Sequence, residues 1–304
     1  MRANNVLKTL LALAMAVLML FSFTACFDDS GDNKEIVGSN GDASNQGSDN
    51  GGSESEQNAT IQETVCFEYD GFKVTAKEII NDSIWGAGIK LYIENNGNKD
   101  YSLSTNAVIV NNCMVSSFSG STVAAGKKAN ETLYLSSSDL EAAGITNIGQ
   151  IEIYFYLYDP NSYDTIYTAD CVTLKTSAYS SMDTTPDESG HVLYNQGGIK
   201  IIGKYVDEST FWGSSVLLYV QNSTGRNIGI SSEDMSINGF MVSGYYYADI
   251  YAGKYSLDEI TIMSSDLTEN GITSIDEIEL KFHIYDSDSY ETIADTDPIK
   301  FKAK

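Results

Sequence analysis

The chain has 304 residues, which fits two ordinary domains better than one. Its 42 acidic and 18 basic side chains give a net charge of −24, so it repels phosphate backbones, and we expect no nucleic-acid partner. Hydrophobic residues make up 42%, enough to build packed cores. Two His and four Cys leave little material for a metal site, so we expect neither a metal nor a cofactor.

Residues 1–25 are typical of an export signal. Arg2 and Lys8 give a positive start, and an uncharged apolar run extends from Leu10 to Phe23. This run is shorter than the roughly 20 residues that a membrane-spanning helix needs. We therefore predict a cleaved signal peptide, with an uncleaved membrane anchor as the alternative.

The end of this signal, Phe23-Thr24-Ala25-Cys26, resembles the lipobox of bacterial lipoproteins. Phe23 departs from the Leu that is usual three residues before the Cys. The resemblance implies cleavage before Cys26 and a diacylglycerol on its thiol, so that the membrane is a partner through this lipid. Two or three acyl chains anchor a protein stably, whereas one does not. We expect a location on the outer face of the cell membrane of a Gram-positive-type bacterium.

Residues 26–64 are mostly Gly, Ser, Asn, Asp and Glu, with almost nothing to bury. Such a composition predicts a disordered acidic tether. Asp28, Asp29 and Asp32 have side chains of the kind that bind calcium, but no Gly or Glu stands where an EF-hand loop requires it.

The remaining sequence repeats itself with an offset of 127 residues, and roughly a third of the paired positions in 66–175 and 193–302 are identical. Chance does not produce this match, so the halves are duplicated domains. We expect repeat 1 over 65–176, a linker over 177–190 and repeat 2 over 191–304.

Each half has the pattern of an antiparallel β-sandwich. Residues 151–158 and 278–285 alternate apolar with polar or Tyr side chains, which predicts strands with one buried face. Other strands in repeat 1, each with a counterpart in repeat 2, are predicted over 72–80, 89–94, 101–110, 132–135 and 166–174. One short helix is predicted in each half, at 138–143 and 265–270, because a Ser cap precedes it and a Gly follows it. The predicted fold is all-β, with two tandem sandwiches.

Two short segments in each half carry a further resemblance. Residues 71–74 and 198–201 read Gly-apolar-Lys-apolar, and a strand ends at 93–96 and at 220–223 in similar sequences. Both resemble the immunoglobulin-like (Ig-like) domains of unknown function in Gram-positive lipoproteins, over about three quarters of the chain. The resemblance implies two Ig-like sandwiches on the outer surface of the membrane. It transfers no catalytic or ligand residue.

The other three cysteines, Cys66, Cys113 and Cys171, all lie in repeat 1, where repeat 2 has Leu193, Phe240 and Pro298. The apolar replacements indicate buried hydrophobic positions for Cys66 and Cys113. Three thiols allow three different single bridges, and repeat 2 has none, so we expect no disulfide and no three-Cys metal site.

Three groups of residues are candidates for chemistry. His191 and His283 are not kept between the halves, and no hydrolase or zinc motif accompanies them, so we expect two exposed histidines. The acidic segments 159–164 and 286–291 could hold a hard cation, but we favour turns in which Asp and Asn bond the backbone.

The third candidate is the segment Tyr245, Tyr246 and Tyr247. An aromatic cluster on one repeat could bind a sugar ring or anchor a protein partner. The alternative is that these residues cover a sheet edge.

We therefore expect a membrane-anchored, non-catalytic binding or structural module at the cell surface, whose partner is an envelope protein or a glycan. The alternatives are a cell-envelope hydrolase, a glycan-binding protein, and a transporter's substrate-binding lipoprotein. The last class has a larger α/β fold, which the strand pattern does not favour.

Overall fold

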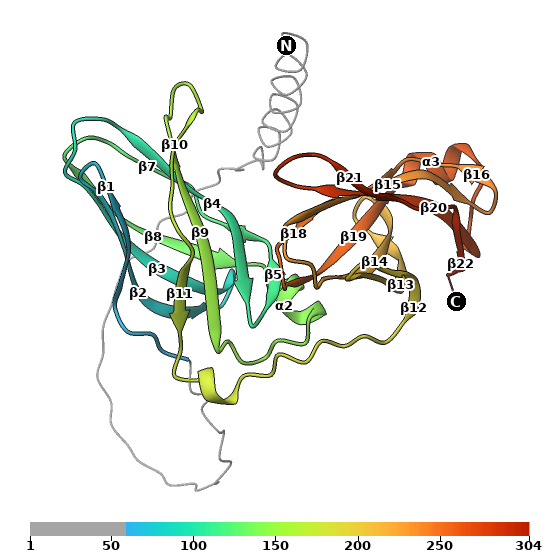
Figure 1. Cartoon of the computed structure of the whole chain (residues 1–304), viewed down its shortest axis with the longest axis horizontal. Coiled ribbons are helices and arrows are strands. Elements are labelled where there is room, and N and C mark those ends of the chain that lie inside the picture. The colour runs from blue at the N-terminus through green and yellow to red at the C-terminus, as the bar shows by residue number, and fades with distance from the viewer. Residues whose placement is uncertain (1–58, 304) are drawn as a thin grey trace, which may run out of the picture. The chain divides into compact units, whose positions relative to one another are not determined.

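A computed structural model describes residues 59–303 (Figure 1). The predicted signal peptide, Cys26 and most of the predicted tether lie outside the described residues. No helix among residues 59–303 is long and apolar enough to cross a membrane. The first described residues already make contacts with repeat 1, because Ile61 forms a β-bridge with Thr176.

Repeat 1 is built almost entirely from strands. Its elements are β1 (Thr64–Tyr69), β2 (Phe72–Asp82), β3 (Gly86–Asn95), β4 (Tyr101–Val110), β5 (Cys113–Val115), β6 (Ser117–Phe118), β7 (Ser121–Val123), β8 (Lys127–Leu135), α2 (Ser137–Ala142), β9 (Gln150–Tyr158), β10 (Thr165–Thr168) and β11 (Val172–Lys175). A 3₁₀ turn, η1 (Tyr179–Ser181), lies in the segment that leads to repeat 2.

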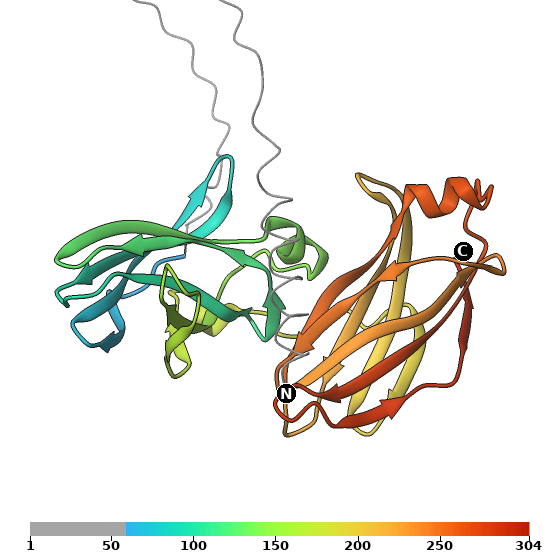
Figure 2. The same ribbon diagram turned by 90° about the horizontal axis from the view of Figure 1, so that it is seen from above.

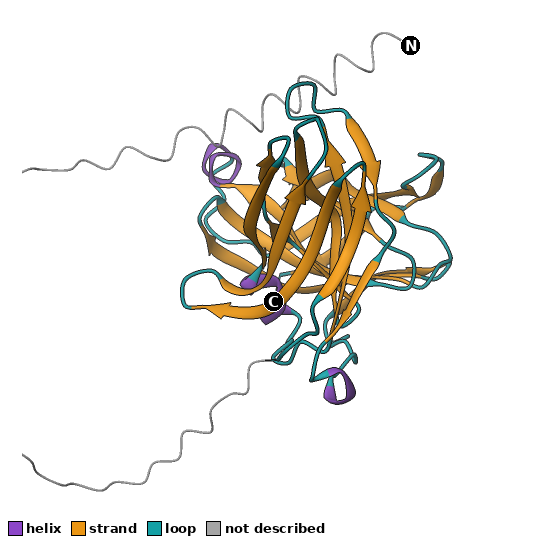
Figure 3. Ribbon diagram, turned by 90° about the vertical axis from the view of Figure 1, so that its left-hand side faces the viewer, coloured by secondary structure: helices purple, strands orange, loops and turns teal. Residues whose placement is uncertain are grey.

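Repeat 2 has the same elements in the same order. They are β12 (His191–Gln196), β13 (Ile199–Thr210), β14 (Gly213–Asn222), β15 (Ile228–Ile237), β16 (Phe240–Met241), β17 (Gly244–Tyr245), β18 (Tyr247–Ile250), β19 (Tyr255–Met263), α3 (Ser264–Glu269), β20 (Glu277–Asp286), β21 (Thr292–Asp295) and β22 (Ile299–Lys302). The prediction of an all-β fold with one short helix in each half is confirmed, and Figure 3 shows how far strands dominate.

The strand order in each half is that of an Ig-like sandwich. In repeat 1 one sheet runs β1-β2-β3-β8-β6, and in the other β4 pairs with β9, which in turn pairs with β10 and β11. If β2, β3, β4, β6, β8 and β9 are called A, B, C, D, E and F, these are the A-B-E-D and C-F-G sheets of the Ig fold, with β1 added outside A. Repeat 2 repeats this order, with β12 added outside β13.

The cores follow the predicted alternation. Along β9 the side chains of Ile151, Ile153, Phe155 and Leu157 are fully buried, and the residues between them are half-buried. On β20 the equivalent residues are buried in the second core in the same way. The period-two pattern therefore placed the inward face of both strands correctly.

Buried asparagines explain some of the identities between the repeats. Asn95 donates through Nδ2 to the carbonyl oxygens of Lys99 and Val123, at 2.8 Å each. Asn222, its equivalent, donates to the carbonyl oxygens of Arg226 and Ile250, also at 2.8 Å each. Both side chains are fully buried, so each amide satisfies backbone groups that water cannot reach.

Some predicted boundaries were wrong. The strand predicted over 132–135 begins at Lys127, because its polar first half pairs with β3 at the surface. The single strand predicted over 166–174 is two strands, β10 and β11, interrupted where the amide of Ala169 donates to the carbonyl of Phe155. The Ser cap exists only in repeat 1, where the Ser136 side chain accepts from the Asp139 amide, whereas α3 has Met263 at that position.

Candidate binding surfaces

The two tryptophans of the chain stand at equivalent hairpin tips. Trp85 lies between β2 and β3, and Trp212 lies between β13 and β14. Each is 54% exposed, and the residues before them are more so, at 81% for Ile84 and 91% for Phe211. Large apolar side chains protrude from both copies at this position. Their burial against a partner would be favourable, so the tips are candidate binding surfaces.

Local backbone chemistry holds these tips. The Asp82 carboxylate accepts hydrogen bonds from the amides of Ile84 and Trp85, at 2.8 and 2.9 Å, and these bonds lower the pKa of Asp82. The glycine after each tryptophan has a positive φ, 76° at Gly86 and 144° at Gly213. At Gly213 a Cβ would also lie 2.4 Å from a backbone oxygen, so the turn of repeat 2 requires a glycine after the tryptophan.

In repeat 1 the tip continues into an aromatic cluster. The ring centroid of Trp85 lies 5.6 Å from that of Phe118 and 6.1 Å from that of Tyr134. The rings are inclined to one another by 63° and 42°, so Trp85 does not extend the flat stack that Phe118 and Tyr134 form. Because its rings are inclined, this protruding aromatic cluster is better suited to enter an apolar pocket of a protein than to stack flat on a sugar ring.

Repeat 2 presents the same surface with different residues. Tyr245 stands at the position of Phe118 and is exposed, whereas Thr261 replaces Tyr134. Phe211 compensates, with its ring edge-on to Trp212 at 4.9 Å. The amide of Ser264 donates to the carbonyl of Trp212 at 2.9 Å, which ties the tip to the start of α3.

The predicted cluster of Tyr245, Tyr246 and Tyr247 does not form one platform. Tyr246 is buried against Phe282, with ring centroids 6.4 Å apart, and burial raises its pKa well above the usual value. Tyr245 lies on β17, which pairs with β19, and Tyr247 lies on β18, which pairs with β15 in the other sheet. The prediction that includes Tyr246 in a ligand surface is wrong, because successive residues of an extended chain point in opposite directions.

The surface at the hairpin tips was not found from the sequence alone. Its signal was present, because Trp85-Gly86 and Trp212-Gly213 are identical between the repeats and each follows a large apolar residue. Identity alone does not distinguish a buried tryptophan from an exposed one. The exposure depends on the long two-stranded ribbons that carry the tips away from the cores, which Figure 2 shows in repeat 2.

The two histidines do not assemble a catalytic arrangement among the described residues. His283 is paired through Nδ1 with the Asp295 carboxylate at 2.6 Å and is stacked on Tyr285. An acid that orients an imidazole is two thirds of a hydrolytic triad, but within residues 59–303 no hydroxyl or thiol bonds the other ring nitrogen. His191 is exposed and stacked on Phe301.

The acidic segments at the ends of β9 and β20 are turns. The Asp159 carboxylate accepts from the amides of Asn161 and Ser162, and Asp286 accepts from Asp288 and Ser289 in the same way. These bonds lower the pKa of both carboxyls. In each Asp both backbone amides bond the same oxygen, Oδ1, as in a turn. No group of three His, Cys, Asp or Glu among the described residues is arranged to hold a metal.

The three cysteines of repeat 1 are free thiols. Cys113 is fully buried and Cys66 is half-buried, and burial raises their pKa to about 12 and about 11. Both thiols are protonated at neutral pH and act as small apolar side chains, as their counterparts in repeat 2 suggested. Cys171 is exposed, so it can react with a reagent in solution.

Comparisons with known proteins give no family. No family model matches the chain, and no curated protein matches it either. Similar solved structures include the Salmonella enterica SafA pilin in complex with the SafB chaperone, the YadV chaperone, and a protein of unknown function from Porphyromonas gingivalis W83.

These likenesses are distant. The identities are 11%, 14% and 11%, and the TM-scores are 0.23, 0.21 and 0.20. The matches cover 78%, 71% and 71% of this chain and 98%, 91% and 89% of the matched chains. At such TM-scores no shared fold follows, and the Ig-like assignment rests on the strand order alone.

Proposed function

We propose that this protein is a lipid-anchored lipoprotein on the outer face of the cell membrane, where its two sandwiches form a non-catalytic binding module for an envelope protein. The single observation that supports binding is the pair of exposed tips, Trp85 and Trp212, each of which precedes a glycine with a positive φ. The lipobox resemblance at Cys26 supports the anchor.

The surface chemistry favours a protein partner over a glycan. A sugar-binding surface needs flat rings with hydrogen-bonding groups around them, whereas Trp85 and Phe118 are inclined by 63° and Phe211 and Trp212 by 87°. Aromatic side chains that enter apolar pockets contribute most of the binding free energy at protein interfaces. Acidic domains on a long acidic tether are also repelled by anionic lipids, which keeps the tips available to partners away from the membrane.

Metabolic labelling tests the anchor. Cells that express the full chain receive a palmitate analogue, and the protein is followed in membrane and medium. We expect label and membrane retention for the unmodified chain, and unlabelled protein in the medium for Cys26→Ala. Labelled Cys26→Ala protein, or an unlabelled natural chain, would contradict the anchor.

Co-sedimentation tests the binding surface. The mature chain is mixed with purified cell envelopes, either untreated or digested with protease. We expect sedimentation with untreated envelopes only, and its loss in Trp85→Ala/Trp212→Ala. Val65→Ala is the matched control, because Val65 is another exposed apolar residue of repeat 1 and should change nothing. Binding that survives protease digestion would indicate a glycan partner instead. Binding that survives the double substitution would show that the hairpin tips are not the binding surface.

A further inference from the structure

One sheet edge of repeat 1 is occupied by a strand of repeat 2. β5 pairs with β19 in parallel, with Cys113 opposite Tyr255 and Met114 opposite Ser256. The amide of Tyr255 donates to the carbonyl of Asn112 at 3.3 Å. It is the only parallel strand pair within residues 59–303. It shows that the β5 edge binds an extended strand.

The strand that fills this edge belongs to an apolar sheet face. Leu217, Tyr219, Tyr255 and Leu257 of repeat 2 are buried in the core of repeat 1. The equivalent residues of repeat 1 are Lys90, Tyr92, Lys128 and Asn130, with both lysines in exposed ion pairs. The face is apolar in repeat 2, where it is covered, and charged in repeat 1, where it is exposed. The residue types on this face therefore indicate whether it is covered.

Repeat 2 carries the same edge without an occupant. β16 is the equivalent of β5 and is the outermost strand of its sheet, and among the described residues it pairs only with β15. Phe240 is 49% exposed and Met241 is 64% exposed, where the equivalent Cys113 is fully buried. An unpaired strand edge with two large apolar side chains is a surface that binds another strand.

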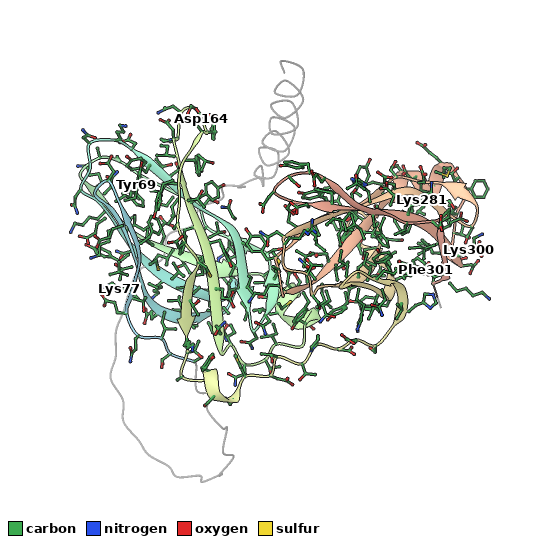
Figure 4. All side chains as sticks on the ribbon, in the orientation of Figure 1. Tyr69, Lys77, Asp164, Lys281, Lys300 and Phe301 are labelled. Atoms are coloured by element: carbon green, nitrogen blue, oxygen red, sulfur yellow. The ribbon has the colours of Figure 1, made fainter. Side chains whose placement is uncertain are left out.

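The charge at this edge also indicates what the occupant is. In repeat 1 the Glu152 carboxylate pairs with Lys254 of the incoming strand at 2.7 Å. Its equivalent, Glu279, pairs at 3.1 Å with Lys300 (labelled in Figure 4) of the neighbouring β22. Lys300 also pairs with Glu277 at 3.1 Å. Glu279 therefore already has a cationic partner within repeat 2, so an occupant of the β16 edge need not supply a lysine and can be apolar.

We propose that the β16 edge binds an extended segment of a partner protein, which adds to the sheet as a parallel strand and places apolar side chains against Phe240 and Met241. Backbone hydrogen bonds supply the affinity in this mode of recognition, and alternate side chains supply the selectivity. A second copy of this chain is not the occupant, because the surface that it would present, the outer face of repeat 1, carries the ion pairs of Lys90 and Lys128.

A peptide provides the probe. The synthetic peptide with the sequence of residues 251–259 contains the strand that occupies the equivalent edge of repeat 1. It is titrated into the isotope-labelled mature chain, and backbone amide shifts are followed by NMR. We expect saturable shifts on β16 and the adjacent β15, with a dissociation constant on the order of 1 mM, and no shifts with a scrambled peptide.

Substitutions locate the site. Met241→Asp should weaken the peptide at least about tenfold, because the peptide would bury an unpaired carboxylate. Val192→Asp is the matched control, since Val192 is an exposed apolar residue on β12, an edge strand of the other sheet of repeat 2. Thermal unfolding verifies that both variants fold. If Met241→Asp does not fold, Phe240→Asp is used in its place.

Two results would overturn the proposal. One is the absence of β16 shifts with the peptide present at several times 1 mM. The other is self-association of the mature chain in sedimentation that Met241→Asp abolishes, because the edge would then bind a second copy. Trp85→Ala/Trp212→Ala should leave the peptide titration unchanged, so this surface and the hairpin tips can fail separately.

Discussion

Substitution of the buried asparagines tests whether the identities between the repeats are structural. In Asn95→Ala the carbonyl oxygens of Val123 and Lys99 lose their donor, and the amide of Gly97 loses the acceptor that it bonds at 3.1 Å. A buried polar group without a partner costs about 1–3 kcal/mol. With two carbonyls affected, one of them less deeply buried, we expect a loss of about 2–4 kcal/mol in the free energy of unfolding.

The matched substitution in repeat 2 should cost about as much. Asn222→Ala removes the donors to Arg226 and Ile250 and the acceptor of the Thr224 amide at 2.9 Å. Asn96→Ala is the control, because Asn96 lies next to Asn95 but is exposed, and it should change stability by less than about 0.5 kcal/mol.

The two tryptophans allow the assay to follow each repeat. Urea unfolding is recorded by fluorescence in Trp212→Phe, where Trp85 reports on repeat 1, and in Trp85→Phe, where Trp212 reports on repeat 2. Because the outer face of repeat 2 is buried in the core of repeat 1, Asn95→Ala should lower the midpoint of both signals. A loss below about 0.5 kcal/mol in both Asn→Ala variants would show that the two buried amides do not stabilise the repeats. A lower midpoint for the Trp85 signal alone would contradict the burial of the repeat 2 face in the core of repeat 1.

Further predictions follow from the same contacts. A thiol reagent should label Cys171 rapidly and Cys66 slowly in the native mature protein, and should reach Cys113 only in urea; equal rates would contradict the burial. Tyr255→Lys, which gives repeat 2 the residue of repeat 1, should separate the two fluorescence transitions, and coincident transitions would count against the apolar interface. The pKa of Asp286 is lowered by backbone amides, so its contribution to stability is present at neutral pH and is lost as the pH falls below the ordinary aspartate value near 3.9. The melting temperature of Asp286→Asn should therefore approach that of the natural chain between about pH 5 and 2, and a constant difference would refute the turn.

The sequence predicted most of the fold because its signals are local. The alternation over 151–158 fixes which side chains point inward, and the duplication shows that the same arrangement occurs twice. The turn function of Asp159 and Asp286 could also be predicted, because an Asp side chain bonds amides two and three residues ahead.

The binding surfaces could not be predicted because they depend on contacts between distant residues. Phe240 and Cys113 are equivalent in sequence, but one is exposed and the other buried, and only the pairing of β5 with β19 explains the difference. Tyr246 was placed on the surface because its neighbours are aromatic, although the strand turns it inward against Phe282. Trp85 and Trp212 are identical between the repeats, but their exposure depends on the turns that carry them.

Tryptophan emission in the presence of cell envelopes tests whether both hairpin tips are binding surfaces. The chain has no other tryptophan, and each indole is half exposed in the free protein, so its emission should lie at long wavelength. We predict that untreated envelopes shift the emission of both Trp85→Phe and Trp212→Phe to shorter wavelength, as each remaining indole leaves water. Envelopes that bind the mature chain and leave both spectra unchanged would contradict the claim.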